Sequence, residues 1–161
     1  MTGRRAGVRL ALVLVSEVMT ESVVTASPQT AASDVAALMR DRNVGSVVLV
    51  DESARLAGMV TDRDLAISLV ADCIDPSTAA AEFATSPVIT GDADMDLDEA
   101  AGVMVTHRIR RLPVLKDGEL AGIVTLDDIA VRTGNLEVAH QMTADVARAV
   151  FPEFYFHQRG G

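Results

Sequence analysis

Apolar residues recur along the chain with two spacings, one typical of helices and one typical of buried strands. Residues 32–42 place Val35, Leu38 and Met39 on one side of a helix. Residues 47–50 form a continuous apolar run, short enough to be a strand that is buried on both faces. The pattern predicts four more elements in this half: a strand over 22–25, a hairpin over 51–55, a strand over 58–60 and a helix over 62–71.

The second half of the chain repeats this order of elements. Asp96 and Glu99 have the spacing of a capping box and predict a helix through His107. Because proline cannot donate to a strand ladder, we expect Pro113, in the apolar run 112–115, at a sheet edge or strand start. The other elements predicted here are helices over 79–84, from 127 to a stop at 133–135, and over 136–150, strands over 88–90 and 123–124, and a hairpin over 116–119.

The two halves also share their sequence. Residues 56–66 and 120–130 are identical at seven of eleven positions, so the chain contains an internal repeat. A repeat of about 60 residues buries little surface alone, so we expect the two copies to pack together in an α+β fold. The resulting organisation is an N-terminal segment (1–15), a first repeat (16–72), a linker helix with the second repeat (73–132), and a C-terminal helix with an aromatic tail (133–161).

Composition excludes several classes of function. The formal net charge of −9 argues against a nucleic-acid or anionic-membrane surface. Cys73 is the only cysteine, which excludes an internal disulfide and fits a cytoplasmic protein. The apolar residues 8–15 follow two arginines as in a secretory signal, but Arg9 interrupts them and no cleavage site follows. We therefore expect a buried strand or short helix there.

The repeated motif ends in a threonine and an aspartate where a strand passes into a helix. The pairs are Thr61 with Asp64 and Thr125 with Asp128. The free N–H groups of a helix N-terminus suit a phosphate, and a carboxylate suits the two vicinal hydroxyls of a ribose. The same residues also form a capping box, which is a purely structural device. Both interpretations stay open, although the same Thr and Asp in both copies favour a functional role.

The chain resembles a tandem pair of CBS domains, also called a Bateman module, and in particular the small stand-alone bacterial members of that family. Several motifs in order, twice, carry the resemblance over residues 16–132: Val18–Thr20, Asn43–Val50, Gly58–Asp64, His107–Val114 and Gly122–Asp128. The second copy departs from the first in its leading segment, where Phe83, Ala84 and Thr85 stand in place of Val18, Met19 and Thr20.

The resemblance implies two strand-helix-strand-strand-helix repeats packed as a pseudo-two-fold pair, with two clefts between them. Such clefts often hold AMP, ADP, ATP or S-adenosylmethionine, with the Asp on the ribose. Carried over residue by residue, the first cleft would comprise Thr61, Asp64, Val88, Thr90, Arg110 and Arg111. The second would comprise Val23, Thr25, Gly45, Ser46, Thr125 and Asp128.

The two clefts differ in charge, because Arg110 and Arg111 align with Gly45 and Ser46. Arginine holds phosphate oxygens in a bidentate way. We therefore expect a phosphorylated nucleotide in the cleft of Thr61 and a less charged ligand, or none, in the other. The alternative is that the two arginines only pair with acidic residues of the surface.

The acidic run, the histidines and the aromatic tail do not indicate a catalytic or metal site. The acidic run 92–98 lacks the glycine and glutamate of a calcium loop, and His107, His140 and His157 lack metal-ligand spacing. The tail 151–156 holds four of the five aromatic residues and either packs on the repeats or contacts a dimer or another partner.

The sequence as a whole favours a regulatory module that senses adenosine nucleotides and has no enzymatic activity, required cofactor or metal. The alternative is a structural or protein-interaction module whose clefts bind no nucleotide. We expect a homodimer, since CBS pairs commonly associate through their helices, and an unknown protein partner is compatible with either function.

Overall fold

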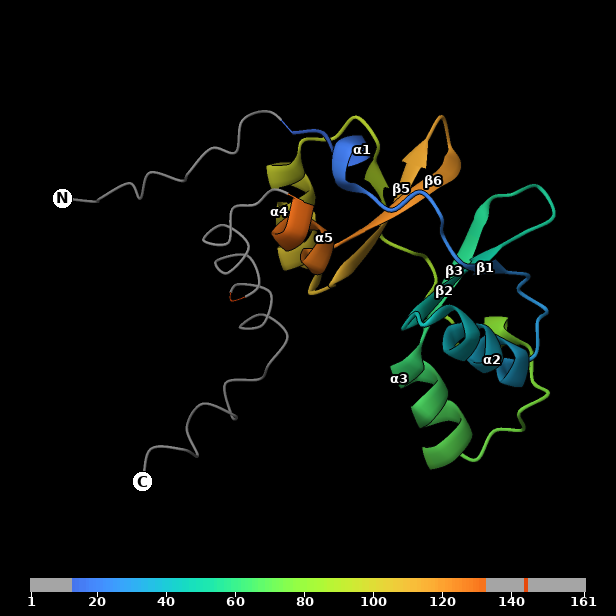
Figure 1. The fold of residues 1–161 in the computed structure, drawn as a ribbon. Coiled ribbons are helices and arrows are strands. Elements are labelled where there is room, and N and C mark those ends of the chain that lie inside the picture. Colours follow the sequence, from blue (N-terminus) through green and yellow to red (C-terminus); the bar gives the residue numbers. More distant parts are fainter. Residues whose placement is uncertain (1–12, 133–143, 145–161) are drawn as a thin grey trace, which may run out of the picture. The chain divides into compact units, whose positions relative to one another are not determined.

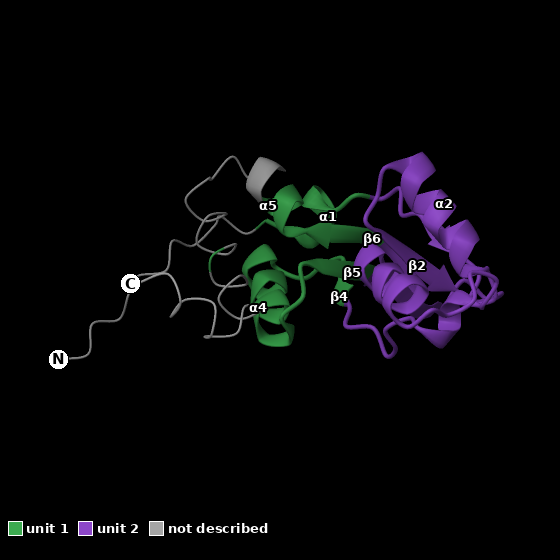
Figure 2. Cartoon of the chain, turned by 90° about the horizontal axis from the view of Figure 1, so that it is seen from below, with its two compact units in different colours: residues 1–20, 91–114, 122–161 green, residues 21–90, 115–121 purple. Residues whose placement is uncertain are grey.

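The structure is a computed structural model that describes residues 13–132 and residue 144 (Figure 1). The chain divides into two compact units (Figure 2). Unit 1 comprises residues 1–20, 91–114 and 122–161, and unit 2 comprises residues 21–90 and 115–121. Apart from residue 144, the helix predicted over 136–150, its preceding stop and the aromatic tail lie outside the described residues.

Unit 2 contains the elements of the first repeat. In chain order these are β1 (Thr25–Ala26), α2 (Ala32–Arg42), β2 (Ser46–Val50), β3 (Leu56–Thr61), α3 (Asp62–Leu65), the π-helix η1 (Ala66–Ala71) and the 3-10 helix η2 (Ala80–Glu82). The sheet has the order β1-β2-β3, with β1 parallel and β3 antiparallel to β2. Its core consists of Ala32, Val35, Met39, Val47, Leu49, Val60, Leu65 and Ala80.

Unit 1 contains the corresponding elements of the second repeat and one helix from the beginning of the chain. They are α1 (Val15–Val18), β4 (Gly91–Asp92), α4 (Leu97–His107), β5 (Arg111–Lys116), β6 (Glu119–Thr125) and α5 (Leu126–Arg132), except that residues 115–121, at the hairpin ends of β5 and β6, are assigned to unit 2. The sheet has the order β4-β5-β6, and the turn between β5 and β6 places Asp117 and Gly118 at positive φ, as a tight hairpin requires. Fully buried side chains include Val15, Leu97, Met104, Leu112, Val124 and Ile129.

The predicted α+β class with two tandem repeats is confirmed, and several elements have the predicted bounds. Helix α2 spans Ala32–Arg42, because Val35 and Met39 are buried and Asn43 ends it in a left-handed conformation. Strand β2 is buried on both faces, as its continuous apolar run predicts. Helix α1 begins at the last residue of the apolar stretch 8–15, where Val15 is fully buried, and residues 8–12 of that stretch lie outside the described residues.

Other predicted elements are shorter than expected. The strands predicted over 22–25 and 88–90 are wrong, because only two residues pair in each case, Thr25–Ala26 and Gly91–Asp92. The helix predicted over 62–71 changes from α to π geometry at Ala66. The helix predicted over 79–84 is a 3-10 turn of three residues. In these segments the apolar side chains are partly buried, but the backbone does not form the long strand pairing or helix that the apolar pattern predicts.

The expectation that Pro113 lies at a sheet edge or strand start is also wrong. Pro113 is buried inside β5, which is the central strand of its sheet. At the equivalent position of the first repeat, the N–H of Val48 donates to the carbonyl oxygen of Val24 at 3.0 Å. Proline lacks this N–H, and the neighbouring strand β4 begins only at Gly91, one repeat position later than β1. The sheet accommodates the proline by omitting one pairing.

Each repeat is completed by a segment that precedes the other repeat in the sequence. In unit 1, Thr20 and Ile123 exchange two backbone hydrogen bonds of 2.8 and 3.0 Å. In unit 2, Thr85 and Met59 exchange two bonds of 2.9 and 3.2 Å. We call residues 18–20 and 83–85 the leading segments. They correspond in the repeat alignment, and each pairs with the strand that carries the glycine motif.

The glycines of the repeated motif permit this close approach. A Cβ on Gly58 would lie 3.1 Å from Ala84 Cβ and 3.4 Å from the carbonyl oxygen of Thr85. A Cβ on Gly122 would lie 3.1 Å from the carbonyl oxygen of Thr20 and closer still to the side chain of Met19. The glycine of the motif is therefore explained by packing of the leading segment.

We predict that Gly58→Ala lowers the free energy of unfolding by about 1–3 kcal/mol, because the added methyl group displaces the leading segment 83–85. The matched control is Gly102→Ala, since Gly102 lies in the exposed part of α4 with no atom within 4 Å of an added Cβ. That control should raise stability by up to about 1 kcal/mol. Urea denaturation of both variants measures the difference, and equal effects would contradict the packing argument.

Candidate functional site

Thr61 and Asp64 form a closed hydrogen-bonded pair at the junction of β3 and α3. The backbone N–H and the hydroxyl of Thr61 donate to Asp64 Oδ2 at 2.8 and 2.7 Å. The backbone N–H of Asp64 donates in return to Thr61 Oγ1 at 3.2 Å. Both residues are half-buried. The carboxylate is thereby fixed through one of its two oxygens.

Thr125 and Asp128 repeat this geometry at the junction of β6 and α5. The N–H and hydroxyl of Thr125 donate to Asp128 Oδ2 at 2.9 and 2.8 Å, and the N–H of Asp128 donates to Thr125 Oγ1 at 3.1 Å. These residues are half-buried as well. The capping interpretation of the motif is thus confirmed in both copies.

The other pair of equivalent helices does not share a cap. Helix α2 begins after Ala31, which has no side-chain capping bond, whereas α4 begins after Asp96, whose carboxylate accepts the N–H of Asp98. A cap contributes about 1 kcal/mol, and the fold evidently forms α2 without one. Helix capping alone therefore does not explain why α3 and α5 keep the same two residues.

The start of α3 is not an open phosphate site, contrary to the sequence expectation. The N–H of Asp62 donates to the carbonyl oxygen of Gly45 at 3.2 Å, and that of Arg63 donates to Asp62 Oδ1 at 2.8 Å. The next N–H, of Asp64, is bound to Thr61. Because these three donors already have acceptors, a phosphate near Thr61 needs cationic side chains instead.

Several predicted site residues lie beside the Thr/Asp pair of their own unit. Ser46 is the direct cross-strand partner of Thr61, and Gly45 is bonded to Asp62 as described above. In unit 1, the carbonyl oxygen of Arg110 accepts the N–H of Leu126 at 3.4 Å. Gly45 and Arg110 therefore make the same backbone hydrogen bond to the start of the following helix in the two repeats.

The remaining predicted residues all belong to unit 2. Thr25 pairs with Val48 in the sheet, and Val23 lies two residues before it, outside regular secondary structure. Val88 and Thr90 lie just before β4, outside regular secondary structure, and are half-buried. Each predicted ligand group combines residues from both units, and this grouping stays a prediction.

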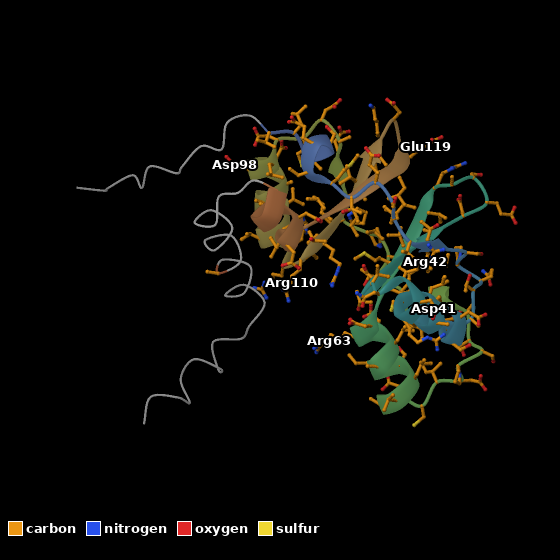
Figure 3. All side chains as sticks on the ribbon, viewed as in Figure 1. Asp41, Arg42, Arg63, Asp98, Arg110 and Glu119 are labelled. Atoms are coloured by element: carbon orange, nitrogen blue, oxygen red, sulfur yellow. The ribbon has the colours of Figure 1, made fainter. Side chains whose placement is uncertain are left out.

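Arg110 and Arg111 have no acidic partner within the described part of the chain, where the single ion pair joins Arg40 to Asp41 at 2.8 Å. Arg110 is exposed and lies at the end of the sheet near the start of α5 (Figure 3). Arg111 is half-buried. Pairing with surface acids therefore finds no support among residues 13–132, and both guanidinium groups are available to an anion.

Thr20 also belongs to this region, although no sequence pattern indicated its role there. Its hydroxyl donates to Asp128 Oδ1 at 3.5 Å, across 108 positions of sequence. The signal in the sequence was the alignment of Thr20 with Thr85 in the two leading segments, but nothing there indicated that the first segment packs beside the second repeat.

Within residues 13–132, no three His, Cys, Asp or Glu side chains gather as metal ligands would. No described helix combines the length and apolar character needed to cross a bilayer.

Comparison with known proteins identifies relatives over most of the chain. The profile of the CBS domain matches residues 15–71 and 80–132. The CBS domain-containing protein YhcV of Bacillus subtilis is 35% identical over 133 residues, which cover 83% of this chain and 94% of that protein.

Solved structures with bound ligands have the same fold. The CBS domain protein PAE2072 from Pyrobaculum aerophilum, complexed with AMP, is 26% identical with a TM-score of 0.71, covering 80% of this chain and 99% of that one. The CBS domain pair of protein MJ0100, in complex with 5'-methylthioadenosine and S-adenosyl-L-methionine, is 28% identical with a TM-score of 0.70, covering 78% and 99%.

Proposed function

Because this chain belongs to the CBS domain family, we propose that it is a regulatory module that binds an adenosine nucleotide at its two Thr/Asp pairs. The observation that carries the proposal is the identical geometry of Thr61–Asp64 and Thr125–Asp128, beside equivalent helices that do not share a cap. The AMP and S-adenosylmethionine complexes of similar structures support the ligand class.

In this proposal the aspartates hold the ribose. Capping occupies Oδ2 of each carboxylate, so a sugar hydroxyl would be accepted by Oδ1. The first site would use Thr61, Asp64, Val88, Thr90, Arg110 and Arg111, and the second would use Val23, Thr25, Gly45, Ser46, Thr125 and Asp128, as the family resemblance assigns them.

The phosphate would be held by Arg110 and Arg111. The first N–H groups of α3 are already bonded, and neither arginine has an ion-pair partner among the described residues. Binding of a ligand to one conformation would shift the population of the protein toward it, which is how such a module regulates. The second candidate remains an interaction module that binds no nucleotide.

We also propose that the protein is a homodimer that associates through α3 and η1. Among the described residues, the exposed large apolar side chains are Ile67 and Val70, with 43% and 77% of their surface accessible. Both lie in the π-helix η1, with exposed Arg63 before them in α3 and exposed Asp72 after them. An antiparallel pairing of two such segments would bury the apolar residues and bring Arg63 of one copy toward Asp72 of the other.

Calorimetry with AMP tests the ligand proposal. The double variant Asp64→Asn/Asp128→Asn should bind AMP at least about tenfold more weakly, because the amide keeps the cap acceptor but replaces the ribose-facing oxygen with a donor. The control Asp62→Asn/Asp127→Asn removes the same two charges from exposed positions in the same turns and should bind normally. If the wild-type protein bound none of AMP, ADP, ATP and S-adenosylmethionine, the interaction module would be favoured.

Comparison of AMP with adenosine tests the phosphate assignment. Arg111→Ala should weaken AMP binding about tenfold or more and leave adenosine binding unchanged, because only AMP carries the group that arginine holds. Arg55→Ala, in the exposed hairpin 51–55, is the control for loss of one positive charge. Unchanged AMP affinity of Arg111→Ala would overturn the assignment.

Light scattering tests the dimer. Val70→Glu should convert the dimer to a monomer with the same circular dichroism spectrum, because a carboxylate would be buried without a partner. Ser33→Glu introduces the same charge at an exposed position of α2 and should leave the dimer intact. A wild-type monomer, or a dimer that persists in Val70→Glu, would contradict this interface.

A further inference from the structure

The two aspartates that cap α3 and α5 differ in the state of their second oxygen. Asp128 Oδ1 accepts the hydroxyl of Thr20 at 3.5 Å. Asp64 Oδ1 has no hydrogen-bond partner among residues 13–132, because the contacts of Asp64 all involve Oδ2 or its backbone. The oxygen available for a ribose hydroxyl is therefore open in one copy and already in use in the other.

The difference arises in the leading segments. Thr20 and Thr85 occupy equivalent positions, and each is fixed by two backbone hydrogen bonds to the neighbouring strand. Thr20 is half-buried and reaches Asp128, whereas Thr85 is exposed and its hydroxyl makes no bond to Asp64. Because both the N–H and the carbonyl oxygen of Thr20 are bonded to Ile123, the Thr20 hydroxyl is held close to the Asp128 carboxylate. The two repeats thus share the backbone pairing of the leading segment, but only the Thr20 segment also makes a hydroxyl contact with the aspartate.

We propose that Thr20 is a positioning residue that lowers the ligand affinity of the Asp128 site, so that the Asp64 site fills first. This inference rests on the proposed function and adds an order to it. A ribose hydroxyl arriving at Asp128 has to share or displace the Thr20 hydroxyl, whereas at Asp64 it meets a free acceptor. A contact of 3.5 Å is longer than an ordinary O–H···O bond, so the competition is modest.

The test isolates the weaker site. In the full-length chain, Asp64→Asn disables the first site and leaves AMP binding to Asp128. Adding Thr20→Val removes the hydroxyl but keeps the shape of the side chain. Calorimetry should then show AMP binding about three- to tenfold tighter than in Asp64→Asn alone, as expected for loss of one competing hydrogen bond. Thr85→Val on the same background is the matched control and should change nothing.

Conservative replacement separates competition from a structural effect. Thr20→Ser retains the hydroxyl and should bind AMP as the parent does, whereas a mere packing change would alter affinity in both variants. Unchanged or weaker AMP binding by Asp64→Asn/Thr20→Val, while the wild type binds AMP, would overturn the role of Thr20 and leave the proposed function standing. Absence of AMP binding in the wild type would overturn both.

Discussion

The fold of each unit depends on one backbone contact, the bridge between a leading segment and the strand that carries the glycine motif. Thr20 bonds to Ile123 and Thr85 bonds to Met59, and each bridge passes over a glycine. A side chain at either glycine would meet the opposing segment at 3.1 Å or less. The bridge therefore explains why a segment from before one repeat completes the other, and it determines which residues lie near each aspartate.

The sequence predicted elements whose stability is local and missed those that depend on distant pairing. Helix α2 has the predicted bounds, because its apolar spacing and the left-handed Asn43 are local signals. The strands expected over 22–25 and 88–90 contain only two paired residues each, because their apolar character reflects burial and not a ladder. The sequence could not predict the central position of Pro113 for the same reason. A proline is tolerated there only because the neighbouring strand β4 begins one repeat position later than β1.

The candidate site was recognisable because the chain contains it twice, yet the sequence could not separate a cap from a binding group. The structure shows that the two roles are compatible, because capping occupies Oδ2 of each aspartate while Oδ1 points elsewhere. A carboxylate held by two donors of Thr61 is also preoriented, so it would lose little freedom in the ligand binding that we propose. The contact of Thr20 with Asp128 could not be predicted from the sequence because it spans 108 residues.

Duplication gave this protein two copies of a framework in which side chains could diverge without disturbing the backbone. The carbonyl oxygens of Gly45 and Arg110 accept equivalent N–H groups at the starts of α3 and α5, although one residue has no side chain and the other is cationic. The residue that ends the preceding helix is left-handed in both copies, with φ of 52° at Asn43 and 56° at Arg108. Arginine is a poorer residue than asparagine for this conformation, so packing of the repeat and not local preference imposes it. The chemistry of each site can therefore be set by a few exposed side chains, while the bridge and the cap keep their positions fixed.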